Sequence, residues 1–199
     1  MNYLAHAYLS FEHSEILVGN MVSDFVKGKK RFDFPAGIQA GITLHREIDR
    51  FTDEHPALKN AKDIFRPAYR LYSAAIADVV LDHFLATDEN EFSEKGLELF
   101  TNKTYEMLNL FEDHFPEKFK TMFPFMKMQN WLYNYRQRWG IEKSLGGLVR
   151  RSKYMEESET AFRLFNENYA ELSGCYRAFF PDVKKLALNF LKNYQAATF

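Results

Sequence analysis

The feature of this sequence that most constrains its fold is an apolar segment of helical length, residues 73–85, with two carboxylates and an imidazole in its middle. Asp78 and Asp82 are four residues apart and therefore share one face of a helix, and His83 follows directly. An isolated buried carboxylate is very unfavourable, so such a helix must bring its acids to a cation or to dense hydrogen bonding. The segment predicts a helix that contributes to a polar site.

A second segment upstream, residues 41–49, has the same character. His45 and Asp49 are four residues apart, and Arg46 follows the histidine. Two helices that each present oxygen and nitrogen ligands are what a divalent metal centre needs. Taken alone, the His45 and Asp49 pair is also compatible with a hydrogen-bonded pair on a helix surface.

The candidate ligands share one property, which is a polar side chain in an apolar helical context. Asp24 belongs to this group because apolar residues flank it, although an acid near a helix end can also be purely structural. Acids in the second half of the chain lie in mixed-charge runs, which are typical of solvated faces. The candidates are Asp24, His45, Asp49, Asp78, Asp82 and His83.

Carboxylates and imidazoles without thiolates suit manganese, magnesium, iron or zinc, and a carboxylate-rich set favours Mn²⁺ or Mg²⁺. Such an ion lowers the pKa of a bound water and polarises a phosphoryl oxygen. Arg46 is a natural clamp for an anion beside the centre, because a guanidinium binds phosphate through two parallel hydrogen bonds.

Helical spacing dominates nearly the whole chain, and alternating strand-like runs are nearly absent, so we expect an all-α helical bundle forming a single domain over residues 1–199. Proline and glycine residues mark where the helical pattern is interrupted and so indicate the ends of individual helices. The expected helices span approximately residues 14–26, 35–54, 56–69, 71–86, 93–114, 124–139, 156–179 and 181–195.

Composition excludes several classes of protein. The net charge of −1 gives no support for nucleic-acid binding. The single cysteine, Cys175, excludes an internal disulfide and fits a reducing compartment. The N-terminal residues do not resemble a signal peptide, and no apolar run is long enough to span a bilayer. We therefore expect a cytoplasmic protein without a membrane partner, while the oligomeric state stays open.

Four motifs, in order along the chain, resemble those of the acyl carrier protein phosphodiesterases, also called acyl carrier protein hydrolases. Weaker similarity continues through residues 131–136 and 147–151, so the resemblance covers most of the chain. The motifs are Met1-Asn2-Tyr3-Leu4-Ala5-His6, the run from Gly19 to Gly28, the run from Gly41 to Asp49 with Thr52-Asp53, and Asp78-Val79-Val80-Leu81-Asp82-His83-Phe84-Leu85.

The resemblance implies an all-helical fold related to the HD-type phosphohydrolases and a manganese-dependent hydrolysis. The reaction removes 4′-phosphopantetheine from the serine of holo-acyl carrier protein, which is the expected substrate and partner. The chain departs from a plain His-Asp doublet, because Arg46 follows His45 and because Asp82 and His83 stand in reversed order.

The resemblance also suggests roles for the candidates. Asp24, His45 and Asp78, with Asp82 or His83, are expected to hold one or two ions, and Asp49 either ligates or orients His45. Arg46 is expected to neutralise phosphoryl charge, and His83 is an alternative proton donor to the leaving serine. His6, in the first motif, is an additional candidate site residue.

A basic rim would steer an acidic carrier protein towards the site. Ordinary solvated loops are the alternative interpretation of these charges. A metal-dependent phosphohydrolase for a nucleotide or another small phosphodiester, and a non-catalytic helical module that binds a carrier protein, remain alternative functions. The basic residues are Lys27, Lys29, Lys30 and Arg31 in one patch and Arg150, Arg151 and Lys153 in a second.

Overall fold

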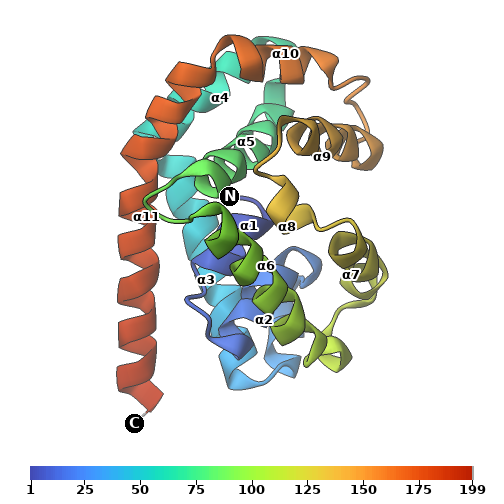
Figure 1. The fold of residues 1–199 in the computed structure, drawn as a ribbon. Helices are drawn as coiled ribbons and strands as arrows, with labels where there is room; N and C mark the ends of the chain where they lie inside the picture. The colour runs from blue at the N-terminus through green and yellow to red at the C-terminus, as the bar shows by residue number, and fades with distance from the viewer. Residues whose placement is uncertain (199) are drawn as a thin grey trace.

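The structure is a computed structural model that describes residues 1–198. Every regular element among these residues is a helix, which confirms the predicted all-α class (Figure 1). The α-helices are α1 (Tyr3–Tyr8), α2 (Ser14–Val22), α3 (Ala36–Glu54), α4 (Pro56–Tyr69), α5 (Ser73–Thr87), α6 (Glu94–Asn109), α7 (Glu117–Met128), α8 (Trp131–Asn134), α9 (Arg138–Arg151), α10 (Glu159–Glu167) and α11 (Tyr169–Thr198). Short 3-10 helices are η1 (Ser23–Phe25), η2 (Gly28–Asp33), η3 (Arg70–Tyr72) and η4 (Glu112–His114).

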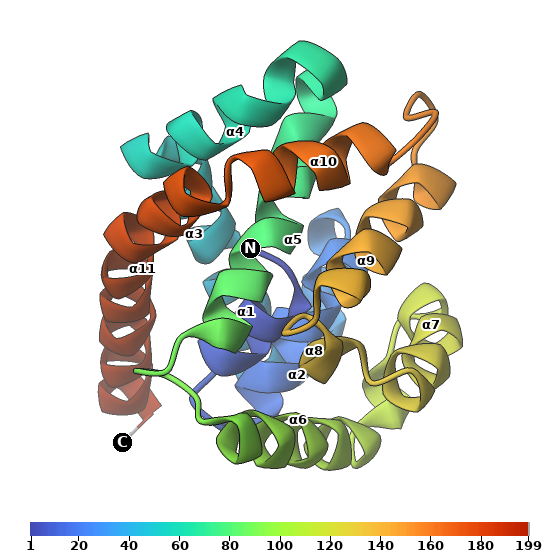
Figure 2. The same cartoon turned by 45° about the horizontal axis from the view of Figure 1, so that its top comes forward.

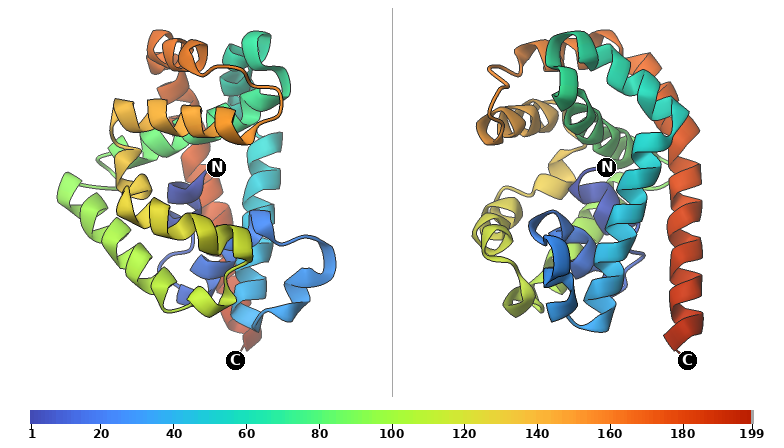
Figure 3. Two further views of the ribbon diagram at one scale, coloured as in Figure 1. Left: turned by 90° about the vertical axis from the view of Figure 1, so that its right-hand side faces the viewer. Right: turned by 180° about the vertical axis from the view of Figure 1, so that it is seen from behind.

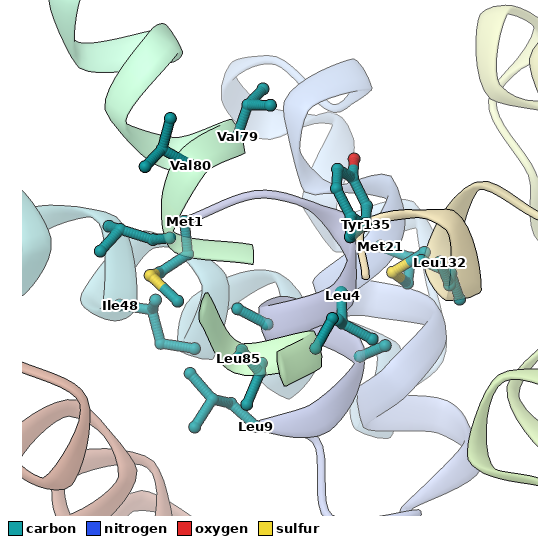
Figure 4. Close-up of a cluster of buried hydrophobic side chains, with 14 of the residues drawn as sticks. Met1, Leu4, Leu9, Met21, Ile48, Val79, Val80, Leu85, Leu132 and Tyr135 are labelled. Carbon is teal, nitrogen blue, oxygen red and sulfur yellow. The ribbon is translucent and has the colours of Figure 1, made fainter. Parts of the chain in front are cut away.

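The short helix α1 lies in the middle of the molecule, between α2 and α5 (Figure 2). Helix α5 also packs against α4, α9 and α11, which explains why most of its side chains are buried and its sequence is so apolar. Side chains from α1, α3 and α5, including Leu4, Ile48 and Val80, share one buried cluster with Met1 (Figure 4). The long helix α11 runs down one side of the bundle (Figures 1 and 3).

Helices α2 and α3 are in backbone contact through two glycines. A Cβ atom added to Gly19 would lie 2.1 Å from the carbonyl oxygen of Ile38, and one added to Gly41 would lie 2.2 Å from that of Ile16. No side chain larger than hydrogen fits at these distances, so the glycines permit the close approach. This approach brings the backbone of α2 within hydrogen-bond reach of the side chains of α3.

Several helices differ from those expected. The helix expected over residues 156–179 is interrupted at Asn168, because α10 ends at Glu167 and α11 begins at Tyr169. Helix α2 ends at Val22, and Asp24 lies in η1 instead of in the same α-helix. The helix expected over residues 124–139 is wrong: α7 passes through Pro124, and α9 begins only at Arg138. Similarly, Pro181 lies inside α11 and does not begin a helix. A proline removes one helical hydrogen bond, at a cost of about 3 kcal/mol, and burial of the flanking apolar side chains outweighs it here.

None of the helices in the described part of the chain combines the length and the apolar character needed to cross a membrane.

Candidate metal centre

Two histidines and one aspartate, from α1 and α3, converge at the centre of the structure. Nε2 of His45 lies 3.0 Å from Oδ2 of Asp49, and Nε2 of His6 lies 3.3 Å from Oδ1 of the same carboxylate. The potential ligand atoms of His6, His45 and Asp49 all lie within 4.8 Å of one another, which is close enough to share one cation. The i, i+4 spacing predicted that His45 and Asp49 share a helix face, and α3 places them so.

A buried asparagine on α2 orients both imidazoles. The amide nitrogen of Asn20 donates to the carbonyl oxygen of His6 at 2.9 Å and to the hydroxyl of Ser10 at 3.0 Å, so its Oδ1 is the acceptor for Nδ1 of His6 at 2.7 Å. The backbone carbonyl of Asn20 accepts from Nδ1 of His45, also at 2.7 Å. With both Nδ1 atoms protonated, both Nε2 atoms face Asp49 as potential ligands.

His6 carries the observation that best tests whether a metal fits. Its side chain is buried, and its Nε2 makes no hydrogen bond to any described residue. The 3.3 Å contact with Asp49 has the distance of an ion pair but does not satisfy hydrogen-bond geometry. An unpaired buried polar atom costs about 1–3 kcal/mol. Coordination of a cation by this nitrogen would remove that cost, so the donor set fits a metal ion.

The ionisable groups around His45 shift one another's pKa values. Burial lowers the pKa of His45, but hydrogen bonds to Asp24 and Asp49 outweigh it and raise the pKa to about 9. Burial opposes ionisation of Asp49, yet both histidines hold the pKa of its carboxyl well below the usual range. The pKa of His6 is lowered by burial and by the charge of His45. The site therefore keeps its carboxylates ionised, as a cation site requires.

Asp24 lies at the more exposed edge of this cluster, where Oδ1 is 3.1 Å from Nε2 of His45. The hydrogen bond from His45 is the largest cause of a lowered pKa at Asp24. The guanidinium of Arg46 donates to the carbonyl oxygen of Val26 at 3.2 Å, two residues beyond Asp24. In this structure Arg46 therefore fixes the segment that carries Asp24.

Asp78, on α5, borders the same cluster through the amino group of Met1. That group lies 2.9 Å from Oδ1 of Asp78 and 3.9 Å from Oδ1 of Asp49. Although burial alone would lower the pKa of the amino group, Asp78 and Asp49 raise it, so it is a cation between two carboxylates.

The structure does not bring Asp82 and His83 to this cluster. The carboxylate of Asp82 is fully buried and accepts from the backbone nitrogens of Asn2, at 3.2 Å, and Leu4, at 2.7 Å, so it caps the N-terminus of α1. His83 points to another side of α5, as expected for adjacent helical residues about 100° apart.

Both nitrogens of His83 have partners away from the cluster. Nδ1 donates to the carbonyl oxygen of Tyr135 at 2.8 Å, and Nε2 lies 3.0 Å from the hydroxyl of Tyr169. Burial lowers the pKa of His83 to about 4, so the ring is neutral near pH 7.

Asn20 was not among the residues predicted from the sequence, and His6 was predicted only through the first motif. Both residues had a signal in the sequence. Asn20 is the one polar side chain in the apolar run from Ile16 to Val22, and His6 stands between two alanines. The basic residues Lys27, Lys29, Lys30, Arg150 and Arg151 are all exposed, the lysines at or within η2 and the arginines in the last turn of α9.

Comparisons with known proteins agree on one family. The family model described as acyl carrier protein phosphodiesterase matches residues 1–183. The acyl carrier protein phosphodiesterase of Photorhabdus laumondii is 30% identical over 190 residues, 95% of this chain and 96% of that protein. Proteins of the same name from Klebsiella pneumoniae and Yersinia pestis are 30% and 29% identical, over 95% and 94% of this chain and 98% and 97% of theirs. No solved structure matches the chain.

Proposed function

The chain belongs to the acyl carrier protein phosphodiesterase family, and on that premise we propose that it hydrolyses the phosphodiester linking 4′-phosphopantetheine to the serine of holo-acyl carrier protein. The products are the apo-protein and 4′-phosphopantetheine. The observation that carries the proposal is the convergence of His6, His45 and Asp49, with potential ligand atoms within 4.8 Å of one another. A shared cation is a common means of stabilising phosphoryl transfer.

His6, His45 and Asp49 would hold this ion, with Asp24 and Asp78 beside them. Two imidazoles with carboxylates favour Mn²⁺ over Mg²⁺, which prefers an all-oxygen set. When bound, the ion supplies Lewis-acid chemistry that activates water and neutralises charge on the phosphoryl oxygens.

Protein side chains supply orientation around the phosphorus. Asn20 holds both imidazoles by their Nδ1 atoms, so each Nε2 stays directed at the reacting centre. Asp24, at the exposed edge, is placed to accept a hydrogen bond from the attacking water. Arg46 positions Asp24 through Val26. His83 is outside this scheme, because both of its nitrogens are engaged elsewhere.

A docking surface for the acidic carrier protein adjoins the cluster. Lys27, Lys29 and Lys30 are exposed and follow Asp24 directly in the chain. The segment between α2 and α3 that contains them projects from the rest of the molecule in the left-hand view of Figure 3. Exposed cations there would steer an acidic partner towards Asp24.

The test is incubation of the protein with holo-acyl carrier protein and Mn²⁺, followed by mass spectrometry of the carrier protein. We expect loss of the phosphopantetheine mass with Mn²⁺ and no loss in a sample stripped with chelator. Bis-p-nitrophenyl phosphate, assayed in parallel, distinguishes a general phosphodiesterase. Turnover of that compound without turnover of the carrier protein would contradict the proposed substrate, and full activity of verified metal-free protein would contradict the ion.

A further inference from the structure

A groove of about 810 Å³ lies beside the candidate metal centre, and α9 forms one of its walls. Trp139, Lys143, Gly147 and Arg151 line it at intervals of four residues, so a single face of α9 runs along its whole length. The volume lies in the range of about 300–1,000 Å³ that is usual for small-molecule sites.

The opposite wall comes from the start of the chain and from α8. Asn2 and Tyr3 contribute on the side of α1, and Trp131, Asn134 and Tyr135 contribute on the side of α8. The groove thus combines aromatic surfaces with amide groups that can donate and accept hydrogen bonds. In Figure 2, α8 and α9 lie next to the N-terminal segment, as this lining requires.

The start of the chain connects the groove to the metal centre. Asn2 follows Met1, whose amino group contacts Asp78 and Asp49 at 2.9 and 3.9 Å. Tyr3, the next residue, also lines the groove. Burial raises its pKa to about 12, the charge of Arg151 opposes this rise, and Asp24 adds to it, so Tyr3 feels charges from both the groove and the cluster.

The C-terminal end of α9, which also lines the groove, carries uncompensated positive charge. Arg150 and Arg151 make no ion pair with any carboxylate among the described side chains. Their guanidinium nitrogens lie 3.7–3.8 Å from the positions that Cβ atoms would take at Gly146 and Gly147. The glycines leave space beneath the guanidinium groups, and Glu142 is the single acid among the lining residues. Such an end is complementary to a phosphate.

We propose that this groove binds the 4′-phosphopantetheine arm of the carrier protein, with its phosphate at Arg150 and Arg151 and its pantetheine chain along α9 towards Trp139. The inference rests on the proposed function and assigns its substrate a binding site. The amides of the arm meet Asn2 and Asn134, and its methyl and methylene groups pack on the indole rings. The two arginines thereby act on the prosthetic group and not on the acidic surface of the carrier protein.

The dimensions agree with this occupant. Twelve residues of α-helix separate Trp139 from Arg151, a rise of about 18 Å. The arm from its ester oxygen to its thiol has about the backbone length of four residues, or about 14 Å when extended. An extended arm therefore fits along α9, with the phosphate at the arginines in its last turn.

The two tryptophans give a direct readout, because Trp131 and Trp139 are the only tryptophans in the chain and both line the groove. We expect titration of the metal-free protein with free 4′-phosphopantetheine to change the intrinsic fluorescence with saturation. Pantetheine and inorganic phosphate, titrated separately, should bind more weakly. Trp139→Phe should remove much of the signal.

Arg151→Met should weaken binding of 4′-phosphopantetheine roughly ten- to hundred-fold, because it removes a charged hydrogen-bond donor. It should raise KM for holo-acyl carrier protein more than it lowers kcat. Arg177→Met is the matched control, since Arg177 is exposed on α11 and bonds only Ser173 one turn before it. Gly146→Glu, which suits a helix and places a carboxylate beside Arg150, should weaken binding as well, because its charge repels the phosphate.

The outcomes separate the two proposals. Saturable binding of the arm without turnover of the carrier protein would support the groove and contradict the proposed function. Turnover with unchanged KM in Arg151→Met and in Gly146→Glu, or no fluorescence response to millimolar 4′-phosphopantetheine, would overturn the groove as the arm site and leave the proposed function standing.

Discussion

The imidazole rings of His6 and His45 stack with their centroids 4.0 Å apart and their planes 16° apart. The residues come from α1 and α3, and a single residue between these helices, Asn20, bonds Nδ1 of each ring. The two bonds differ in kind, because the side chain of Asn20 holds His6 and its backbone carbonyl holds His45. A substitution at position 20 can therefore release one ring and leave the other held.

Asn20→Ala should weaken Mn²⁺ binding roughly 10- to 100-fold, as loss of a partner that orients a metal ligand usually does. It should also lower the free energy of unfolding by about 2–3 kcal/mol, because Nδ1 of His6 and other buried groups lose partners. Calorimetric titration with Mn²⁺ and urea unfolding measure the two effects.

Ser10→Ala is the control for this variant. Ser10 accepts from the Asn20 amide and donates to the carbonyl oxygen of His6, but it does not contact the imidazole. It should destabilise the protein and leave the affinity for Mn²⁺ within about twofold, since the ring keeps its anchor. Equal Mn²⁺ affinities of Asn20→Ala and wild type would show that the side chain of Asn20 does not support a metal site.

The close backbone contact between α2 and α3 predicts how substitution of its glycines changes stability. Gly41→Ala should destabilise the protein by about 3 kcal/mol or more, because its Cβ would lie 2.2 Å from a backbone oxygen that cannot move independently. Gly174→Ala, in α11, is the matched substitution, with no atom within 4 Å of the new Cβ. It should stabilise by about 0.5–1 kcal/mol through helix propensity. Similar changes in the two unfolding curves would refute the contact.

The sequence was sufficient to predict the all-α class and the bounds of several helices, because those depend on local periodicity and on proline. The helix from Pro56 to Tyr69 is an example in which both ends agree. The pairing of His45 with Asp49 was also predictable, since both lie on one helix and the spacing alone brings them to one face.

The contacts that a side chain makes with other helices were not predictable from the sequence. Asp82 shares a helix face with Asp78, but its carboxylate contacts α1. This helix has six residues and is too short to be recognised from sequence periodicity. Its carboxylate caps that helix instead of joining the cluster. The same limit applies to His6, because its approach to His45 depends on how α1 docks between α2 and α5.

The capping role of Asp82 can be separated from metal binding. Asp82→Ala, unfolded in the presence of chelator, should lose about 2–4 kcal/mol, because two backbone donors at the start of α1 lose their acceptor. Asp82→Asn should lose less, since its amide retains one carbonyl oxygen. If Asp82 instead served mainly as a metal ligand, the alanine variant would be as stable as wild type without metal and would differ only with Mn²⁺.

The proposed docking surface predicts a dependence on ionic strength. Lys29→Glu with Lys30→Glu should lower kcat/KM for holo-acyl carrier protein roughly tenfold at 0.01 M salt and far less at 0.5 M, because screening shortens the reach of exposed charges. Lys59→Glu with Lys95→Glu makes the same change in net charge on exposed residues of α4 and α6. Equal effects of the two double variants would assign the loss to net charge and not to this surface.

The lowered pKa of His83 predicts that the free energy of unfolding changes with pH. Its pKa is about 4 in the folded protein, through burial, against about 6.5 when unfolded. Between these values the unfolded state binds more protons, so the free energy of unfolding falls as pH falls from about 6.5 to about 4. We expect His83 to contribute about 2 kcal/mol of the loss between pH 7 and pH 5.

Urea unfolding of wild type and His83→Gln at pH 7 and pH 5 measures this contribution. Glutamine does not titrate, so the difference in stability between the two proteins should shrink by about 2 kcal/mol at the lower pH. Other groups that titrate in this range, such as Asp82, whose pKa burial raises to about 7, are present in both proteins and cancel in the comparison. A difference that is the same at both pH values would mean that His83 has the same pKa in the folded and unfolded states, which would contradict the lowering of its pKa by burial.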